Sequence, residues 1–108
     1  MTTTTTVIPA EDAMLERALD TAHAIAPDGL SRQAYARLHA AQSKTVWGRR
    51  HQRRLALVQD GVMLASAMQY DLTAILDGRP VRVCGVGAVF REAADRDGSH
   101  AQSLVRRL

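Results

Sequence analysis

Two Asp-Gly pairs, Asp60-Gly61 and Asp77-Gly78, divide the second half of the chain into three extended segments. Apolar residues typical of strands stand on both sides of each pair. Asp and Gly both adopt positive φ with little strain, so the dipeptide is a strong signal for a two-residue hairpin loop. The sequence therefore predicts antiparallel strands over residues 54–59, 62–72 and 81–90.

The third segment is apolar or small on both faces, which is typical of a strand in the middle of a sheet. Side chains alternate along a strand. One face therefore holds three valines and two glycines: Val81, Val83, Gly85, Gly87 and Val89. The two glycines predict a groove on that face, and Cys84 on the other face is interpreted as a small core residue. A three-strand meander that leads into a helix also leaves an uncovered sheet edge beside this segment.

The first half of the chain is predicted to be mostly helical. The β-branched run from Thr2 to Ile8 fits either a short first strand or an untethered end. Pro9 suits the first turn of a helix, which the turn Pro27-Asp28-Gly29 then ends. Ser31 fits the cap of a second helix that frays near residues 43–48.

The C-terminal residues predict one more helix. Apolar residues recur there at the spacing of a buried helical stripe that opens near Ser99: Ala101, Leu104, Val105 and Leu108. The chain stops inside this stripe, without a terminating Gly or Asn. We therefore expect residues 1–108 to be a single, partial domain.

Composition narrows the function classes. A chain of 108 residues with 46% apolar and 23% charged residues fits one globular domain. Its single cysteine excludes a disulfide framework and favours a reducing cytoplasm. No apolar run approaches the ~20 residues that span a bilayer, so no membrane contact is expected. No metal is expected either, because the histidines are scattered without a ligand-like spacing: His23, His39, His51 and His100.

A dense basic run follows Trp47: Arg49, Arg50, His51, Arg53 and Arg54. Arginines that pair with phosphates and a tryptophan that stacks on bases would suit a small nucleic-acid binder. A solvated face beside an edge strand explains the same run. The net charge of only +3 and the 4% aromatic content favour the solvated face over nucleic-acid binding.

The passage from the third strand into the last helix could form an anion site. The first N–H groups of a helix have no internal partners and carry partial positive charge, so they can bind a pyrophosphate where side chains are small. Gly98, Ser99 and Ala101 are small. An ordinary helix start capped by Asp97 or Ser99 is the alternative.

The order of elements over residues 54–108, with Gly85-Val86-Gly87-Ala88-Val89-Phe90 and the loop from Arg96 to Ala101, resembles the GNAT superfamily of N-acyltransferases, and a bacterial branch of it in particular. The resemblance implies an α+β fold. Two N-terminal helices would pack on a mostly antiparallel sheet of three to four strands, followed by a C-terminal helix. It also implies a domain that ends before the last strands of the family.

The resemblance further implies acetyl-CoA as the cofactor and an amine as the acceptor, without assigning a catalytic residue. The cofactor would contact backbone groups of two segments: Val89, Phe90 and Arg91 on the strand, and Arg96, Gly98, Ser99 and Ala101 in the loop. The family writes this loop Gln/Arg-x-x-Gly-x-Gly/Ala. Arg96 and Ala101 match its ends, whereas Asp97 and Ser99 stand where Gly is frequent. Asp97 would bring a carboxylate toward the phosphates, which it repels.

A second hypothesis assumes the same fold without catalytic activity. Here the chain is a non-catalytic protein that pairs its open sheet edge with another chain, a second copy of itself included. Acetyl-CoA binding separates the two hypotheses.

Overall fold

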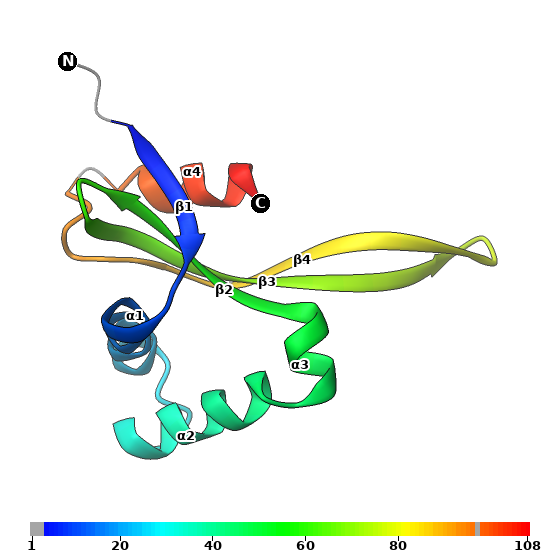
Figure 1. Ribbon diagram of the computed structural model, residues 1–108, viewed down its shortest axis with the longest axis horizontal. Coiled ribbons are helices and arrows are strands. Elements are labelled where there is room, and N and C mark those ends of the chain that lie inside the picture. Colours follow the sequence, from blue (N-terminus) through cyan, green and yellow to red (C-terminus); the bar gives the residue numbers. More distant parts are fainter. Residues whose placement is uncertain (1–3, 97) are drawn as a thin grey trace.

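The computed structural model describes residues 4–96 and 98–108. Within them the chain forms a four-stranded antiparallel sheet in the order β1-β2-β3-β4, together with four helices (Figure 1). The expected α+β architecture is confirmed. The bounds are β1 Thr5–Pro9, α1 Asp12–Ile25, α2 Arg32–Ser43, α3 Val46–His51, β2 Gln52–Gln59, β3 Val62–Leu76, β4 Arg79–Arg91 and α4 His100–Arg107.

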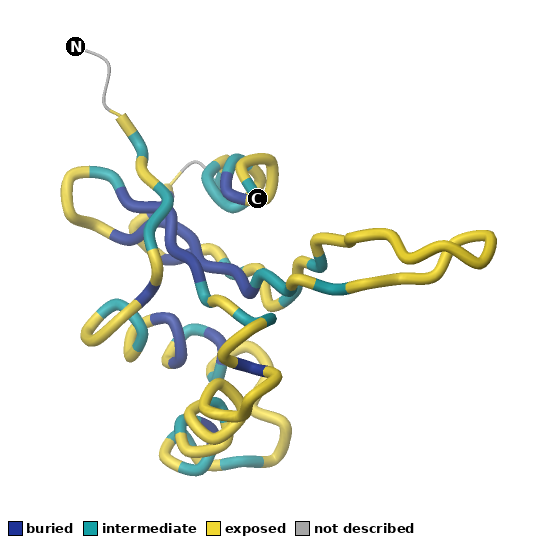
Figure 2. Tube along the Cα trace, turned by 45° about the vertical axis from the view of Figure 1, so that its right-hand side comes forward, coloured by how far each residue is buried: buried dark blue, intermediate teal, exposed yellow. Residues whose placement is uncertain are grey.

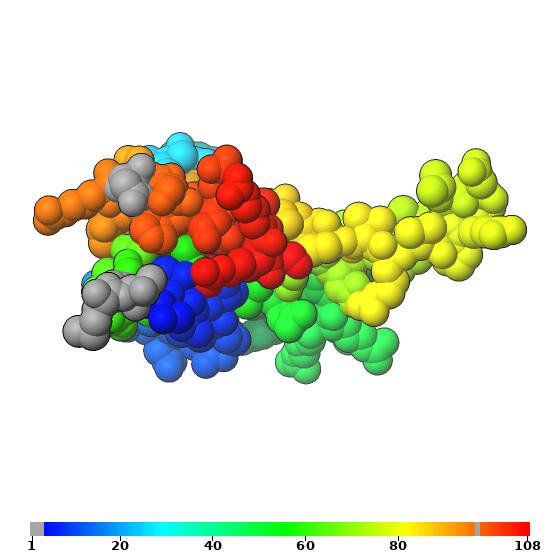
Figure 3. Space-filling model, turned by 90° about the horizontal axis from the view of Figure 1, so that it is seen from above, coloured from blue at the N-terminus to red at the C-terminus, as the bar shows by residue number. Residues whose placement is uncertain are grey.

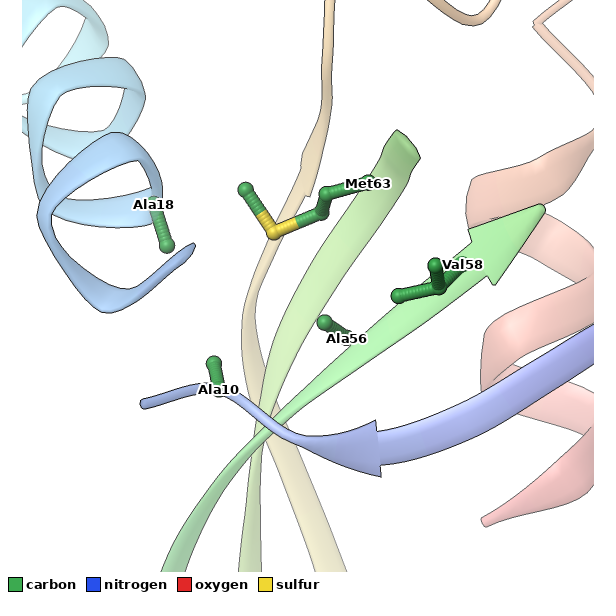
Figure 4. Packing of buried hydrophobic residues seen from close by; sticks show 5 residues of the cluster. All are labelled: Ala10, Ala18, Ala56, Val58 and Met63. Atoms are coloured by element: carbon green, nitrogen blue, oxygen red, sulfur yellow. The ribbon is translucent and has the colours of Figure 1, made fainter. Parts of the chain in front are cut away.

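The sheet separates two layers of helices. The helices α1 and α2 lie on one side of it and α4 on the other (Figure 1). Small and apolar side chains fill the α1 side: Ala10, Ala18, Ala56, Val58 and Met63 (Figure 4). A second cluster packs under α4: Leu57, Ala65, Ala67 and Leu104. Neighbouring residues of β2 fall into different clusters because side chains alternate along a strand.

Both Asp-Gly turns form as predicted. Asp60 and Gly61 have φ of 52° and 75°, and Asp77 and Gly78 have φ of 51° and 77°. Two successive positive φ values give the hairpin turn whose twist matches the flanking strands. These turns fix the register of β2 with β3 and of β3 with β4.

The prediction that the segment 81–90 lies in the middle of the sheet is wrong. No strand among the described residues pairs with the outer edge of β4. The outer parts of β3 and β4 project as an exposed arm, in which Ile75 is 71% and Val83 39% exposed (Figure 2). The prediction relied on the lack of polar side chains in this segment. A buried central strand and an exposed apolar arm can both have this composition, so the pattern does not distinguish between them. Cys84 lies on the arm and is exposed, which corrects its interpretation as a core residue.

The N-terminal segment forms a strand. β1 pairs with β2, and Thr2 and Thr3 lie outside the described residues. Pro9 ends this strand and does not start the helix, because α1 begins at Asp12. A proline suits this position since β1 is an edge strand, where its missing N–H disturbs little. The C-terminal helix α4 lies beside β1 (Figure 3), and Nη1 of Arg107 donates to the carbonyl oxygen of Thr5 at 3.0 Å.

Side-chain caps start the helices α2 and α3. Ser31 accepts a hydrogen bond from the N–H of Ala34 at 3.1 Å, which confirms the predicted cap. The fraying predicted at residues 43–48 is wrong, because Thr45 accepts from the N–H of Gly48 at 2.9 Å and starts α3. In the described part of the chain, no helix has both the length and the hydropathy to cross a membrane.

Candidate functional site

The strand β4 contains a bulge at Ala88. Its register with β3 shifts between Ser66 and Met68, and Ala88 has a φ of 48°. Positive φ is uncommon in residues other than glycine, and β-bulges are frequent next to active sites. The bulge interrupts the regular alternation of faces just before Val89, the first of the strand residues expected to contact a cofactor.

Beyond the bulge, β4 pairs with β3 on its inner edge, and no strand of the described residues pairs with its outer edge. Phe90 pairs with Ser66, and the N–H of Glu92 donates to the carbonyl oxygen of Leu64 at 3.0 Å. The Phe90 side chain packs against buried residues of α1 and α2, which fixes the strand end on the helical layer. Alternate backbone groups of an edge strand point away from the sheet. Part of the backbone N–H and C=O groups from Val89 to Arg91 therefore lies on an edge that no described strand covers.

The groove predicted over Gly85 and Gly87 is occupied, so that expectation is corrected. Tyr70 lies opposite Gly85 in the register. A Cβ on Gly85 would lie 3.3 Å from Cβ of Tyr70, and one on Gly87 would lie 3.4 Å from its Cε2. The tyrosine side chain thus covers both glycines, as an aromatic residue often does across a strand pair.

The start of α4 is closed by Asp95. Its carboxylate is buried and accepts hydrogen bonds from the N–H groups of Gly98 and His100, both at 3.2 Å. The same carboxylate lies 2.6 Å from Nδ1 of His100, so the ring donates from that nitrogen. The His100 side chain is 22% exposed and is held by this buried carboxylate. The amide of Gly98, which was expected to face a pyrophosphate, and the neighbouring amide of His100 thus both point to a side chain of the chain itself.

The other predicted loop residues lie in different environments. Gly98 has a φ of 76°, and a Cβ there would lie 2.7 Å from Nη1 of Arg91, so the structure brings strand and loop together. Arg96 and Ser99 are exposed, while Ala101 packs toward the sheet. Asp97 lies outside the described residues.

The basic run borders an open pocket of about 600 Å³ between α3, β2 and the arm. Arg49, Arg50 and Arg53 line it together with Arg82, which pairs with Asp71 at 3.1 Å. Arg49, Arg50 and Arg53 are exposed, as a solvated face requires. The expectation is wrong for Arg54, whose terminal nitrogens are buried, and for the strand, because β2 lies inside the sheet and not at its edge. Among the described residues no group of three or more His, Cys, Asp or Glu side chains could hold a metal ion.

Sequence reasoning missed Asp95 and Tyr70. An Asp shortly before a Gly-Ser pair at a predicted helix start is a recognisable capping signal, which could have identified Asp95. The two glycines on one strand face could have pointed to an aromatic partner across the hairpin. The aromatic partner can be identified as Tyr70 only when the register of β3 with β4 is known.

No family model matches the chain, and no curated protein matches its sequence. Solved structures, however, are similar to the chain in fold. A probable N-acyltransferase from Enterococcus faecalis V583 aligns with 98% of the chain at 14% identity and a TM-score of 0.62. The aminoglycoside antibiotic 6'-N-acetyltransferase AAC(6')-IG from Acinetobacter haemolyticus aligns with 94% at 15% identity, also with a TM-score of 0.62.

The chain has the N-acetyltransferase fold. It spans 27% of the length of the Enterococcus protein and 67% of the Acinetobacter enzyme. At such identities the likeness concerns the N-acetyltransferase fold alone, and it confirms the fold that the sequence resemblance implied.

Proposed function

We propose that the chain acts in N-acyl transfer from acetyl-CoA to an amine, and that it carries the coenzyme-binding part of the site. The observation that carries the proposal is the bulge at Ala88 on the open edge of β4. It directly precedes the backbone groups of residues 89–91, in a chain with the N-acetyltransferase fold.

The residues present fit such a coenzyme in most respects. The amides of the pantetheine arm would pair with outward N–H and C=O groups of Val89 and Arg91, as a strand pairs with an exposed edge. The guanidinium groups of Arg91 and Arg96 would supply positive charge for the pyrophosphate. The N–H groups of Gly98 and His100 would take part only after the Asp95 carboxylate leaves them.

The chemistry is direct transfer. The amine nitrogen attacks the thioester carbonyl, the coenzyme leaves as a thiolate, and the amine proton passes to solvent or to a base that the structure does not assign. An outward backbone N–H beside the bulge would hold the negative charge that develops on the carbonyl oxygen. The single cysteine also fits a reducing cytoplasmic compartment.

Calorimetric titration of the chain with acetyl-CoA tests the proposal. We expect binding that weakens roughly tenfold in Arg91→Gln, because a charge-assisted contact to phosphate is lost. Arg79→Gln, at the far end of the arm, removes the same charge and is expected to leave the affinity unchanged. No heat at millimolar acetyl-CoA contradicts the proposal.

A non-catalytic role is the second candidate, and the exposed arm favours it. Ile75 and Leu76 are 71% and 64% exposed, and the β4 edge is open in the described part of the chain. Two copies could pair these edges. Light scattering after size exclusion is then expected to give a dimer that Val86→Pro converts to monomer, since proline blocks edge pairing. A monomer at every concentration excludes self-pairing.

A further inference from the structure

A cavity of about 550 Å³ lies on the α1 side of the sheet, away from the β4 edge. It is partly open to solvent and is bordered by the start of α1, by α2 and by the strands β2 and β3. Most of its wall is apolar: Leu15, Leu19, Ala36, Ala40 and Met68. Its volume falls in the range of small-molecule sites, about 300–1,000 Å³.

The side chain of Arg54 forms part of this wall. Arg54 lies two residues before Ala56 in β2, so it belongs to the face of the strand that points to α1. Both terminal nitrogens, Nη1 and Nη2, are buried and have no hydrogen-bond partner among the described residues. A desolvated guanidinium end without an acceptor is unfavourable, because the four N–H donors of Nη1 and Nη2 have left water without gaining a protein acceptor among the described residues.

The carboxylates nearby do not neutralise Arg54. Glu11 and Glu16 also line the cavity, and Glu16 is already paired with Arg32 at 2.8 Å. The His39 ring lines the cavity as well, and its pKa is lowered, first by burial and second by the positive charge of Arg54. The cavity thus combines an apolar wall with an uncompensated positive charge.

We propose that this cavity binds a small organic carboxylate with an apolar chain, and that the carboxylate pairs with the guanidinium of Arg54. The planar fork of an arginine matches the two oxygens of a carboxylate. The apolar wall favours a hydrocarbon chain. A phosphate dianion fits less well, because Glu11 and Glu16 repel two negative charges more strongly than one.

Binding requires a small adjustment of the wall, since both nitrogens are covered by protein atoms. Met68 lies opposite Arg54 in the register and lines the same cavity. Its unbranched side chain adapts readily to a new neighbour. The methyl signal of Met68 is therefore expected to shift when the carboxylate enters.

The first experiment uses the unmodified chain and nuclear magnetic resonance. Hexanoate, its neutral analogue hexanamide and inorganic phosphate are titrated separately, without any coenzyme. Hexanoate is expected to shift the Arg54 and Met68 signals and to raise the pKa of His39. Hexanamide and phosphate are each expected to bind roughly tenfold or more weakly, as loss of a charge-assisted bond predicts. Phosphate that binds as tightly as hexanoate overturns the proposal, as does hexanoate without effect at millimolar concentration.

The second experiment compares Arg54→Met with Arg37→Met. Arg37 is exposed on α2 and does not line the cavity. Arg54→Met is expected to weaken hexanoate binding roughly tenfold or more and to raise the midpoint of thermal unfolding, because an apolar side chain replaces an unpaired buried charge. Arg37→Met is expected to change neither. Hexanoate affinity within twofold of wild type in Arg54→Met contradicts the proposal. Absence of acetyl-CoA binding leaves both results valid, since neither uses the coenzyme.

Discussion

The carboxylate of Asp95 binds His100 twice, through the backbone N–H at 3.2 Å and through ring Nδ1 at 2.6 Å. These bonds close the first turn of α4 from inside the protein. The buried carboxylate stabilises the turn and at the same time places negative charge where the proposed site would receive a pyrophosphate. Stability and coenzyme affinity therefore oppose each other at this residue.

Asp95→Asn separates these two effects. We expect a loss of about 1–3 kcal/mol in the free energy of unfolding, because a charged acceptor of buried N–H groups is lost. The affinity for acetyl-CoA is expected to rise, since one negative charge leaves the loop. Urea unfolding and calorimetry measure the two quantities. Asp77→Asn removes the same charge from an exposed turn and should change neither; an unchanged stability of Asp95→Asn contradicts the capping role.

The bulge predicts an unusual response to substitution at Ala88. A β-branched side chain is poorly tolerated at positive φ, so Ala88→Val is expected to cost about 1–3 kcal/mol. Glycine adopts this φ freely, and Ala88→Gly should stay within about 1 kcal/mol of wild type. Ala74→Val, on the exposed arm, is the control. Equal stabilities of Ala88→Val and Ala74→Val in urea would show that the bulge is unstrained.

The α4 helix is expected to depend on Leu104. This side chain is fully buried under the helix, whereas Val105 beside it is 39% exposed. Leu104→Ala should cost about 2–5 kcal/mol, because it removes apolar contacts and leaves a cavity. Val105→Ala changes a neighbouring aliphatic residue and is expected to cost under about 1 kcal/mol. Similar losses for both variants in thermal unfolding contradict this packing.

His39 makes stability depend on pH. The pKa of the folded His39 is lowered from 6.5 by burial and then by Arg54, against a weaker opposite effect of Asp28. As the pH falls below 6.5, His39 is therefore protonated in the unfolded chain before it is protonated in the folded chain. The free energy of unfolding then decreases as the pH falls toward the lowered pKa. His39→Gln should flatten this part of the curve measured by urea unfolding between pH 5 and pH 8. An unchanged slope contradicts the assignment.

The two hairpins and the helices α1, α2 and α4 were predictable because their signals are local, whereas α3 was missed. The Asp-Gly turns, the Ser31 cap and the stripe that contains Leu104 each depend on residues close in sequence. The place of β4 in the sheet was not predictable, because apolar residues fill a buried strand and an exposed arm alike. Tertiary neighbours decide between the two.

For the residues of the candidate site, the sequence predicted the strand or helix to which each belongs better than it predicted their neighbours in three dimensions. The sequence placed Arg91 and Gly98 at a strand end and a helix start, and the structure brings them into contact. The hydrogen bonds of Asp95 with the N–H groups of Gly98 and His100 depend on the conformation of the loop, which composition does not reveal. Arg54 lies in strand alternation with Ala56, yet only the three-dimensional surroundings show that its guanidinium lacks a partner.

The strand order β1-β2-β3-β4 also sets the order of assembly. The hairpins β2-β3 and β3-β4 join neighbours in sequence and can close within microseconds, while β1 reaches β2 only across three helices. To pair with Gln52–Gln59, β1 has to close a loop that spans α1, α2 and α3. In refolding of the whole chain, we therefore expect the pairing of β1 with β2 to be the slowest of the three strand pairings.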